Sequence, residues 1–340
     1  MKYIPIWLVH VKSKDLLEVY YSYNILGKTN ESMYTEIPSY NLRKMILHDS
    51  YILNNNISFL KSIRTLEVLD ISNTGSQSHR NSFTNYDELL DHPTWEGTME
   101  ILNLSQLNMG FFPESIVCLR LLKELYLSKN ALVWLPEAIG CLKALEVLDI
   151  SINSVCVLPS TIKELKNLRV LKLEHNRLAD IILLKDLFNL KILDLYENEL
   201  DWFELDIHRY QYLDLERNCF GASLLGATYD EKRSHYREKY NLGDRGTGCN
   251  NEYLEEALKS ESSSESDFSE DSTSSNVIPD DNYEEECWDD EKVKSHKRRR
   301  NRKVARRVTF LKSLLVLISF RMITMKKNVG MMKKLNLILK

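Results

Sequence analysis

Aliphatic residues recur at fixed positions through the middle of the chain. Four segments that begin at Leu122, Leu145, Leu168 and Leu190 share the pattern L-x-x-L-x-L-x-x-N-x-L, with Ile or Val accepted in place of Leu. Their starting residues lie 23, 23 and 22 positions apart. The alternation within L-x-x-L-x-L places the aliphatic side chains on one side of a short strand. The pattern therefore predicts a stack of similar units, each contributing one parallel strand.

Between the strands, the pattern predicts a turn and a short helix. Each strand is followed by an asparagine, whose amide can satisfy the backbone groups that a turn leaves open. We expect these asparagines to be structural: Asn130, Asn153, Asn176, Asn198 and Asn218. Three prolines (Pro113, Pro136 and Pro159) then precede apolar residues at the i, i+3 spacing of a short helix. This is the leucine-rich repeat pattern, and it predicts a right-handed α/β solenoid, an open horseshoe of about seven or eight repeats.

The pattern also divides the chain into regions. The repeat weakens toward both ends and disappears where a polar, charged sequence begins near residue 241. That sequence has too few hydrophobic residues to fold by itself. We predict an irregular N-terminal cap (1–41), a leucine-rich repeat domain (42–225), a C-terminal cap (226–240) and a disordered tail (241–340), the tail being acidic and serine-rich over 251–291, basic over 292–307 and apolar with basic residues over 308–340.

One repeat is longer than its neighbours. The unit that starts at Leu66 runs to Met99, and its surplus of about ten residues falls in the polar stretch 76–92. Extra residues in a repeat are expected to emerge as a loop on one face. Two interpretations remain open: a tolerated surface insertion, which we favour, and a binding loop.

Composition changes this picture only in the tail and for the cysteines. The net charge of the 340 residues is −4, but an acidic block and a basic block nearly cancel. Cys118 and Cys141 occupy equivalent positions in adjacent repeats and are predicted to be buried small hydrophobic residues. The scattered cysteines favour a reducing compartment, and the N-terminal apolar run lacks a cleavage site for a signal peptide. We therefore expect a cytoplasmic protein, with the nucleus as the alternative.

The sequence holds no phosphate-binding loop, no Cys/His cluster with metal-ligand spacing and no nucleophile–base pair. We therefore expect a non-enzymatic protein with no cofactor and no metal site. Solenoids usually bind partners on their concave surface, and the outward positions of the last strands are mainly acidic, which favours a basic partner. A solvated face without a partner is the alternative. The candidate partner-binding residues are Tyr126, Asp149, Lys172, Glu174, Asp194, Tyr196, Glu197, Asp214 and Glu216.

The tail contains a four-residue motif, RVTF, at Arg307, Val308, Thr309 and Phe310. It matches the R/K-V-x-F peptide by which regulators dock onto the catalytic subunit of type-1 protein phosphatase. In such docking, an extended peptide adds to a sheet edge while alternate side chains fill pockets. The candidate docking residues are Arg307, Val308 and Phe310, although so short a motif also arises by chance.

The charged blocks of the tail suggest further roles. Ser262 and Ser264 each precede an acidic residue by three positions, which suits acidophilic kinases, while an acidic spacer is the equal alternative. The basic block supplies nuclear-import candidates: Lys297, Arg298, Arg299, Arg300, Arg302 and Lys303. Nucleic acid is not expected as a partner. The apolar run 314–320 is too short for a transmembrane span, but the tail suits contact with a membrane surface.

Residues 135–178, LPEAIGCLKALEVLDISINSVCVLPSTIKELKNLRVLKLEHNRL, resemble the intracellular leucine-rich repeat proteins of the Ras-scaffold class and their plant Ras-group-related counterparts. The repeats after Leu178 are similar to those of the leucine-rich regulatory subunit of type-1 protein phosphatase. These resemblances imply a non-enzymatic signalling scaffold whose partners include that phosphatase or a small GTPase. The order of repeat domain, acidic tail and basic cluster also resembles the acidic nuclear phosphoproteins that bind histones.

From the sequence we therefore expect a protein-interaction scaffold or adaptor that binds its partner on the concave face, with type-1 phosphatase as a candidate partner. Two alternatives remain. One is a nuclear protein that binds histones or other basic proteins. The other is a scaffold held at a membrane surface by its basic and apolar tail.

Overall fold

The computed structural model describes residues 17–23, 41–53, 60, 63–75, 80–92, 94–219, 226–243 and 245. All of them belong to the first of two units of the chain, Met1–Ser266. The basic block, the RVTF motif and the apolar end of the tail lie outside the described residues.

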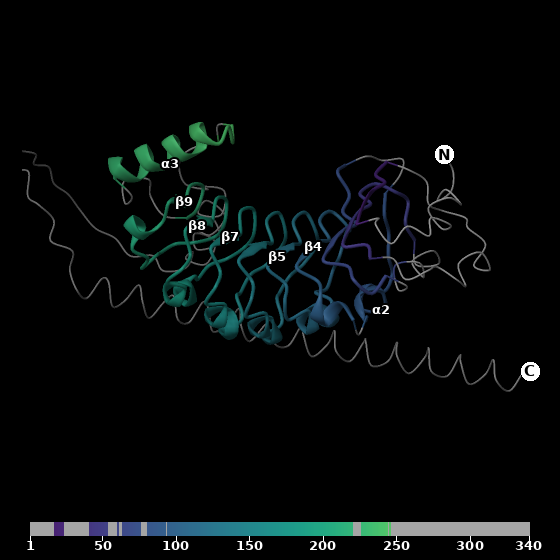
Figure 1. The fold of residues 1–340 in the computed structure, drawn as a ribbon. Coiled ribbons are helices and arrows are strands. Elements are labelled where there is room, and N and C mark those ends of the chain that lie inside the picture. Colours follow the sequence, from purple (N-terminus) through teal and green to yellow (C-terminus); the bar gives the residue numbers. More distant parts are fainter. Residues whose placement is uncertain are drawn as a thin grey trace, which may run out of the picture. The chain divides into compact units, whose positions relative to one another are not determined.

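Nine strands of the described residues form one parallel sheet, in which the order in space is the order in the chain (Figure 1). Each strand has three residues, and its central residue is buried and pairs in register with the central residue of the next strand. This arrangement confirms the predicted leucine-rich repeat solenoid. The strands are β1 (Glu18–Tyr20), β2 (Lys44–Ile46), β3 (Val68–Asp70), β4 (Ile101–Asn103), β5 (Glu124–Tyr126), β6 (Val147–Asp149), β7 (Val170–Lys172), β8 (Ile192–Asp194) and β9 (Tyr212–Asp214).

The sheet begins earlier in the chain than the first repeat that was recognised in the sequence, at Leu42. Strand β1 lies within residues 1–41, where we expected an irregular cap, and it pairs with β2 through Val19 and Met45. The sheet of nine strands is consequently longer than the expected seven or eight repeats. The sequence around β1 carries the repeat pattern in a degraded form, with Leu16, Val19, Asn24 and Leu26 at its positions and Tyr21 in place of an aliphatic residue. This degraded repeat was not recognised from the sequence alone.

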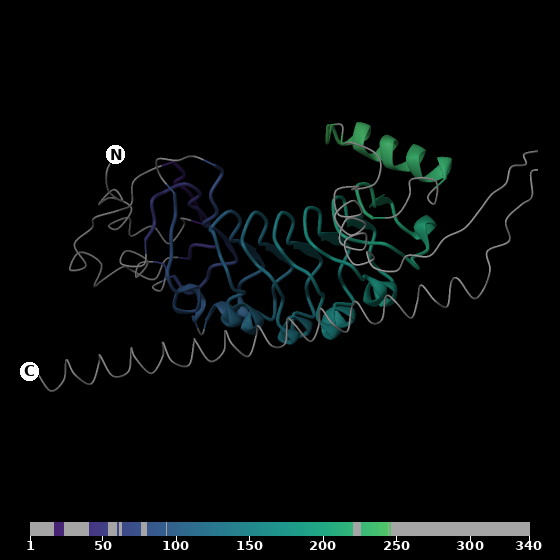
Figure 2. The ribbon, with the colours of Figure 1, turned by 180° about the vertical axis from the view of Figure 1, so that it is seen from behind.

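Short 3₁₀ helices return the chain from one strand to the next. They run along one side of the sheet in both Figure 1 and Figure 2. As predicted, Pro113, Pro136 and Pro159 stand immediately before three of them. The helices are η4 (Trp95–Gly97), η5 (Glu114–Cys118), η6 (Glu137–Cys141), η7 (Ser160–Glu164), η8 (Ile182–Asp186) and η9 (Ile207–Arg209).

The prediction that Cys118 and Cys141 are buried is wrong, because both are exposed. Each is the last residue of a five-residue 3₁₀ helix, η5 and η6, whose inward positions are taken by Ile116 and Ile139. Equivalent positions in two repeats share an environment, but the alignment does not say whether that environment is inside or outside. With about three residues per 3₁₀ turn, only one position per turn points to the core.

The asparagines act as predicted, and each one joins two successive repeats. Asn176 Oδ1 accepts a hydrogen bond from Val155 N–H at 2.9 Å, and its Nδ2 donates to the carbonyl oxygens of Ile150 and Leu173, each at 3.0 Å. Asn130, Asn153, Asn198 and Asn218 repeat this arrangement. We call these five residues the asparagine ladder.

The long repeat supplies a further asparagine from its insertion. Asn81 is buried; its Oδ1 accepts from the backbone N–H groups of Ser50 and Ile52, and its Nδ2 donates to the carbonyls of Leu47 and Ile71. These are the contacts that the asparagine ladder makes elsewhere. We expected the insertion to be a surface loop, but Asn81 supplies the ladder contacts that Asn73, in the turn of the same repeat, does not make.

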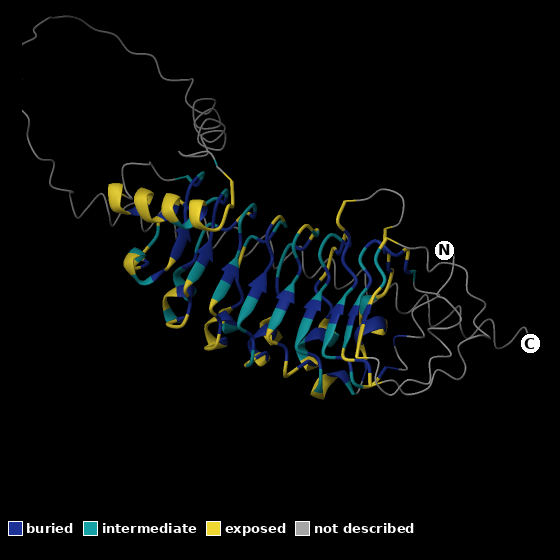
Figure 3. Cartoon of the chain, turned by 45° about the horizontal axis from the view of Figure 1, so that its top comes forward, coloured by how far each residue is buried: buried dark blue, intermediate teal, exposed yellow. Residues whose placement is uncertain are grey.

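Two α-helices occur among the described residues. Helix α2 (Tyr86–Leu90) belongs to the insertion and buries Leu89 and Leu90 in the core. Helix α3 (Ala227–Lys239) follows the last strand, and it packs against β9 through buried Tyr229, Arg233 and Arg237. Its remaining faces are largely exposed (Figure 3). A terminal repeat otherwise leaves one side of its core open to water, and α3 covers part of it.

A row of left-handed residues marks the turns after β5 to β9. Each residue directly before an asparagine of the ladder has positive φ, and none of them is glycine: Lys129, Ile152, His175, Glu197 and Arg217. Ile152 stands out with φ of 51°, because a β-branched side chain disfavours this conformation.

We expect Asn176→Ala to lower the free energy of unfolding by about 1–3 kcal/mol, because it leaves buried backbone groups of two repeats without partners. Asn189→Ala is the matched control, since Asn189 is exposed and donates one hydrogen bond, to Lys166 O at 2.8 Å. Urea unfolding followed by circular dichroism measures both variants. Equal losses in the two would contradict the proposed role of the ladder.

Candidate functional site

The outer face of the sheet is built from the first and third residue of each strand. Because the central residue points into the core, its two neighbours point the opposite way. We call this surface the open sheet face; it corresponds to the predicted concave face. In Figure 3 its strands carry residues of intermediate exposure beside buried ones. Register pairing places the third residues in one row, as expected from the sequence: Asn103, Tyr126, Asp149, Lys172, Asp194 and Asp214.

The first residues of the strands form a second row, which the sequence analysis did not single out. Its members are mostly aliphatic, partly exposed and in register on consecutive strands, apart from Glu124. The signal was present, because the position before each central leucine is repeatedly Val or Ile. We call it the aliphatic row: Val68, Ile101, Val147, Val170 and Ile192.

Charged residues border the aliphatic row on its other side. They pair between successive repeats: Arg43 Nη1 lies 2.9 Å from Glu67 Oε1, and Lys123 Nζ lies 2.8 Å from Glu100 Oε2. These side chains are well exposed, so each pair contributes little to stability. Their effect is to give the edge of the open sheet face mixed charge.

The last strands carry an acidic cluster around the guanidinium of Arg245. Arg245 Nη1 donates to both carboxylate oxygens of Asp194, at 2.9 and 2.8 Å, and to Asp214 Oδ2 at 3.4 Å. Its Nη2 donates to Glu174 Oε1 at 3.5 Å. The guanidinium carbon lies 4.8 Å from the ring centre of Tyr196, within range of a cation–π interaction. Four of the predicted partner-binding residues therefore meet around Arg245.

Helix α3 adds two more arginines at Asp214. Arg233 Nε lies 2.8 Å from Asp214 Oδ1, and Arg237 Nη1 lies 3.9 Å from Asp214 Oδ2. The hydroxyl of Tyr212 also donates to Asp214 Oδ2, at 3.0 Å. Because Asp214 is fully buried, this concentration of donors and positive charge compensates for the removal of its carboxylate from water.

The remaining predicted residues lie outside the cluster. Tyr126 donates to Glu124 Oε2 at 2.7 Å, and Asp149 is buried and accepts from the hydroxyl of Ser151 at 2.6 Å. Lys172 Nζ lies 3.8 Å from Asp149 Oδ2. Glu197 is placed at the edge of the face.

Glu197 forms ion pairs near the surface, whereas Glu216 is buried. Glu197 Oε2 lies 3.3 Å from Arg217 Nε and 3.5 Å from His175 Nδ1. Glu216 is buried, and its backbone N–H donates to Asp214 Oδ1 at 3.2 Å. Tyr196, Asp149, Asp194 and Asp214 are buried as well. Partner binding by these residues stays a prediction. Among them, Tyr126, Lys172 and Glu197 are more accessible than the buried ones.

The arginines of this site were missed by the sequence analysis for different reasons. Arg245 is an isolated cation in a polar segment that was interpreted as a linker, and 51 positions separate it from Asp194. In α3, however, Tyr229, Arg233 and Arg237 recur at intervals of four residues. That spacing marks one helix face, so the sequence did contain a signal for a face that carries arginines.

Burial and like charges raise the pKa of Glu174 to about 7. Its removal from water is the largest cause, followed by the charges of Asp194 and Asp149, which outweigh Arg245 and Lys172. Burial likewise raises the pKa of Asp194, against the lowering effect of Arg245. For Arg245, burial favours the neutral form, but Asp194 and Glu174 prevail and raise its pKa. The cluster therefore holds a permanently charged cation.

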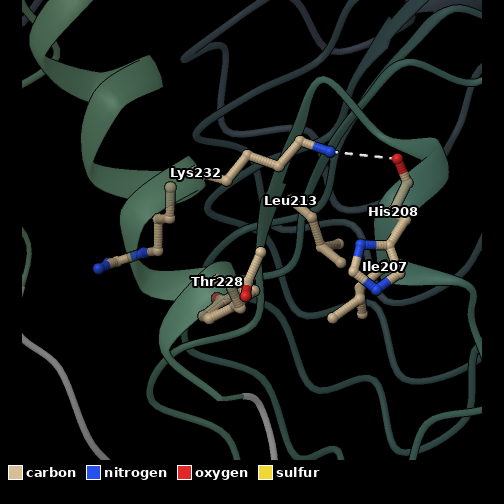
Figure 4. A pocket seen from close by; sticks show the side chains of 7 residues that line it. Ile207, His208, Leu213, Thr228 and Lys232 are labelled. Atoms are coloured by element: carbon tan, nitrogen blue, oxygen red, sulfur yellow. Dashed lines mark hydrogen bonds between the residues drawn. The ribbon is translucent and has the colours of Figure 1, made fainter.

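A shallow cleft lies between α3 and η9 (Figure 4). Ile207, His208, Leu213, Thr228 and Lys232 are among its lining residues, and Lys232 Nζ donates to His208 O at 3.1 Å. Its side chains are part of the contact between α3 and the last repeat. We assign it a packing role rather than ligand binding.

Within the described ranges, His, Cys, Asp and Glu side chains do not come together in groups of three or more that could hold a metal ion. Over the same ranges, every helix is too short or too polar to cross a membrane.

We expect Glu174→Gln to flatten the pH dependence of stability. Between about pH 7 and the ordinary Glu value of 4.5, folded protein holds a proton on Glu174 that the unfolded chain lacks, so the wild type gains stability as the pH falls. The variant should be more stable than the wild type at about pH 8, by on the order of 1 kcal/mol, and the difference should shrink by about pH 5. Urea unfolding between about pH 5 and pH 8 measures the difference in the free energy of unfolding between variant and wild type, with Glu146→Gln as the control. An unchanged slope in Glu174→Gln would contradict the assignment.

Comparisons with known proteins concern the repeat architecture. No protein-family model matches the sequence, and no curated protein matches it. A solved leucine-rich repeat protein of Leptospira interrogans is 22% identical, with a TM-score of 0.42 and coverage of 65% of this chain and 65% of that chain.

Two plant structures are also similar. The ectodomain of the Arabidopsis thaliana receptor kinase GASSHO1/SCHENGEN3, in complex with CASPARIAN STRIP INTEGRITY FACTOR 2, is 21% identical with a TM-score of 0.43, over 59% of this chain and 27% of that chain. The ectodomain of the Arabidopsis thaliana receptor kinase SOBIR1 is 35% identical with a TM-score of 0.28, over 30% of this chain and 57% of that chain. The match thus spans less than two-thirds of each of these three structures. By its own repeat pattern and its stacked parallel strands, this chain has the leucine-rich repeat fold.

Proposed function

We propose that the chain is a non-enzymatic protein-interaction scaffold that binds a partner protein on the open sheet face. The aliphatic row carries this proposal. Ile101, Val147, Val170 and Ile192 lie partly exposed on the same face of one sheet, next to charged residues. Apolar positions grouped on a surface and rimmed by polar residues are typical of protein-binding sites.

The rigidity of the face supports the same function. Strands β4 to β8 hydrogen-bond to their neighbours on both sides, and the asparagine ladder fixes the turn at the end of most of them. Side chains on such a framework lose little freedom when a partner binds, so more of the interaction energy appears as affinity. The acidic cluster at one end would fix the direction in which a basic partner lies.

We expect the double substitution Val147→Glu and Val170→Glu to reduce the recovery of bound partners at least about tenfold. A bound partner would cover both positions, and the two glutamates would then be buried there without an opposite charge. Affinity purification after cross-linking, compared protein by protein with the wild type, measures the loss.

The control is Phe188→Glu, which places the same charge on a side chain that is 74% exposed and follows η8 on the helical side. This variant should retain the partners. Equal losses from both variants, or no loss from the double variant, would refute binding on the open sheet face.

A more specific proposal is that RVTF recruits type-1 protein phosphatase. It rests on the motif alone, because Arg307, Val308 and Phe310 lie outside the described residues. We expect Val308→Ala with Phe310→Ala to abolish pulldown of the purified phosphatase catalytic subunit, since these are the side chains that would fill its pockets. Thr309→Ala, at the variable position of the motif, should leave binding intact. Undiminished pulldown by the double variant would exclude this proposal.

Two other functions stay as proposals. The acidic cluster, which already holds arginines, favours a basic partner such as a histone, and Lys297 to Lys303 would then direct nuclear import. A cytoplasmic location that does not change on removal of residues 292–307 would argue against this. A small GTPase as partner, and contact of the tail with a membrane surface, rest only on the resemblance and on the tail sequence; salt-sensitive binding to anionic vesicles would test the latter.

A further inference from the structure

We propose that Glu174, Asp194, Asp214 and Tyr196 form a binding site for an arginine side chain, and that Arg245 occupies this site within the chain until an arginine of a partner protein replaces it. We call the four residues the arginine site. This inference rests on the proposed function, because it assigns a ligand to one end of the open sheet face.

The contacts select a guanidinium rather than a compact ammonium group. Asp194 accepts from Nη1 through both of its oxygens, while Glu174 accepts from Nη2 on the other arm. Two carboxylates are thus contacted by different nitrogens of one planar group. The guanidinium plane also lies within reach of the Tyr196 ring. The ammonium group of a lysine is a single compact charge, so it cannot contact Asp194 and Glu174 through two separate nitrogens.

The site requires a cation even though α3 supplies two others. Arg233 and Arg237 both form their ion pairs with Asp214, at 2.8 and 3.9 Å. Asp194 and Glu174 rely on Arg245 for a direct ion pair. Buried Glu174 Oε2 has no hydrogen-bond partner among the described residues. Removal of Arg245 would leave Asp194 and Glu174 without their ion pair, and a second arginine would then be favoured.

Arg245 is held less firmly than the arginines of α3. The side chains of Arg233 and Arg237 are 5% and 8% exposed, whereas that of Arg245 is 22% exposed. Arg245 lies beyond the end of α3, after residues 240–243, which are exposed. Arg237 supports this connection by donating to the carbonyl oxygens of Leu242 and Gly243, at 2.6 and 2.8 Å. Exchange of Arg245 therefore need not disturb α3.

The aliphatic row leads to the arginine site. Ile192 and Asp194 are alternate residues of β8 and point to the same face, and Val170 is the register partner of Ile192. An extended partner segment could place an arginine in the site and apolar side chains over Ile192 and Val170. The chemical class of partner is thus a peptide segment with one arginine next to apolar residues.

The test uses the full-length protein and a fluorescein-labelled pentapeptide, Gly-Gly-Arg-Gly-Gly, with the lysine and citrulline peptides beside it. We expect Arg245→Ala to bind the arginine peptide at least about tenfold more tightly than the wild type, because the internal competitor is gone. Adding Asp194→Asn to Arg245→Ala should remove this gain. The lysine peptide should bind several-fold more weakly, and the uncharged citrulline peptide should not bind.

Three results would overturn the proposal: no gain in Arg245→Ala, a gain that persists with Asp194→Asn, or equal binding of the arginine and lysine peptides. Arg169→Ala is the matched control, since the Arg169 side chain is exposed and its Nε lies 3.6 Å from Glu146 Oε2; it should show no gain. Circular dichroism checks that each variant is folded.

If Arg245→Ala does not fold, Arg245→Lys keeps the charge and should still bind the arginine peptide more tightly than the wild type does. Absence of that gain would overturn the proposal too. The outcome is independent of the Val147→Glu and Val170→Glu experiment, which changes neither the arginine site nor Arg245. Loss of partners there with no gain here would leave the scaffold function standing and exclude the arginine site.

Discussion

The structure depends on how the chain satisfies its backbone after each three-residue strand. A turn so soon after a strand leaves N–H and carbonyl groups inside the protein, and each would cost free energy if it had no partner. Asn176 and its equivalents satisfy groups of their own repeat and of the preceding one. The turn of one repeat is therefore completed by the next, and the leucine columns can stack only because this condition is met along the array.

The same dependence on neighbours explains the acidic end. Among the described residues β9 is the last strand of the array, so residues outside the repeats must complete and cover it. Helix α3 and Arg245 do so, with arginine side chains facing Asp194 and Asp214. A cluster that the sequence presents as an open acidic surface is thus partly an internal contact. The carboxylates of Asp194 and Asp214 therefore take part both in the cover of the last strand and in the proposed partner site.

The repeated features were predictable from the sequence and the unrepeated ones were not. Leucine columns and asparagines recur at 22 or 23 positions, so a local pattern reports on contacts between repeats. Asn81 performs the same task from an insertion, where no register identifies it. Arg245 was invisible because one arginine in a polar segment has no periodicity. Asp194 ends β8 and Glu174 follows β7, and the ion pairs of both with Arg245 could not be foreseen from the repeat pattern.

Ile152 shows how much backbone strain the middle of the array tolerates. It is 42% exposed and adopts φ of 51°, where asparagine or glycine would be under less strain. Its neighbour Asn153 still makes the hydrogen bonds of the ladder. The turn is consequently held by contacts with adjacent repeats and not by the local preference of its residues. Substitutions at this row can therefore vary the chemistry along the edge of the face while the backbone path stays the same.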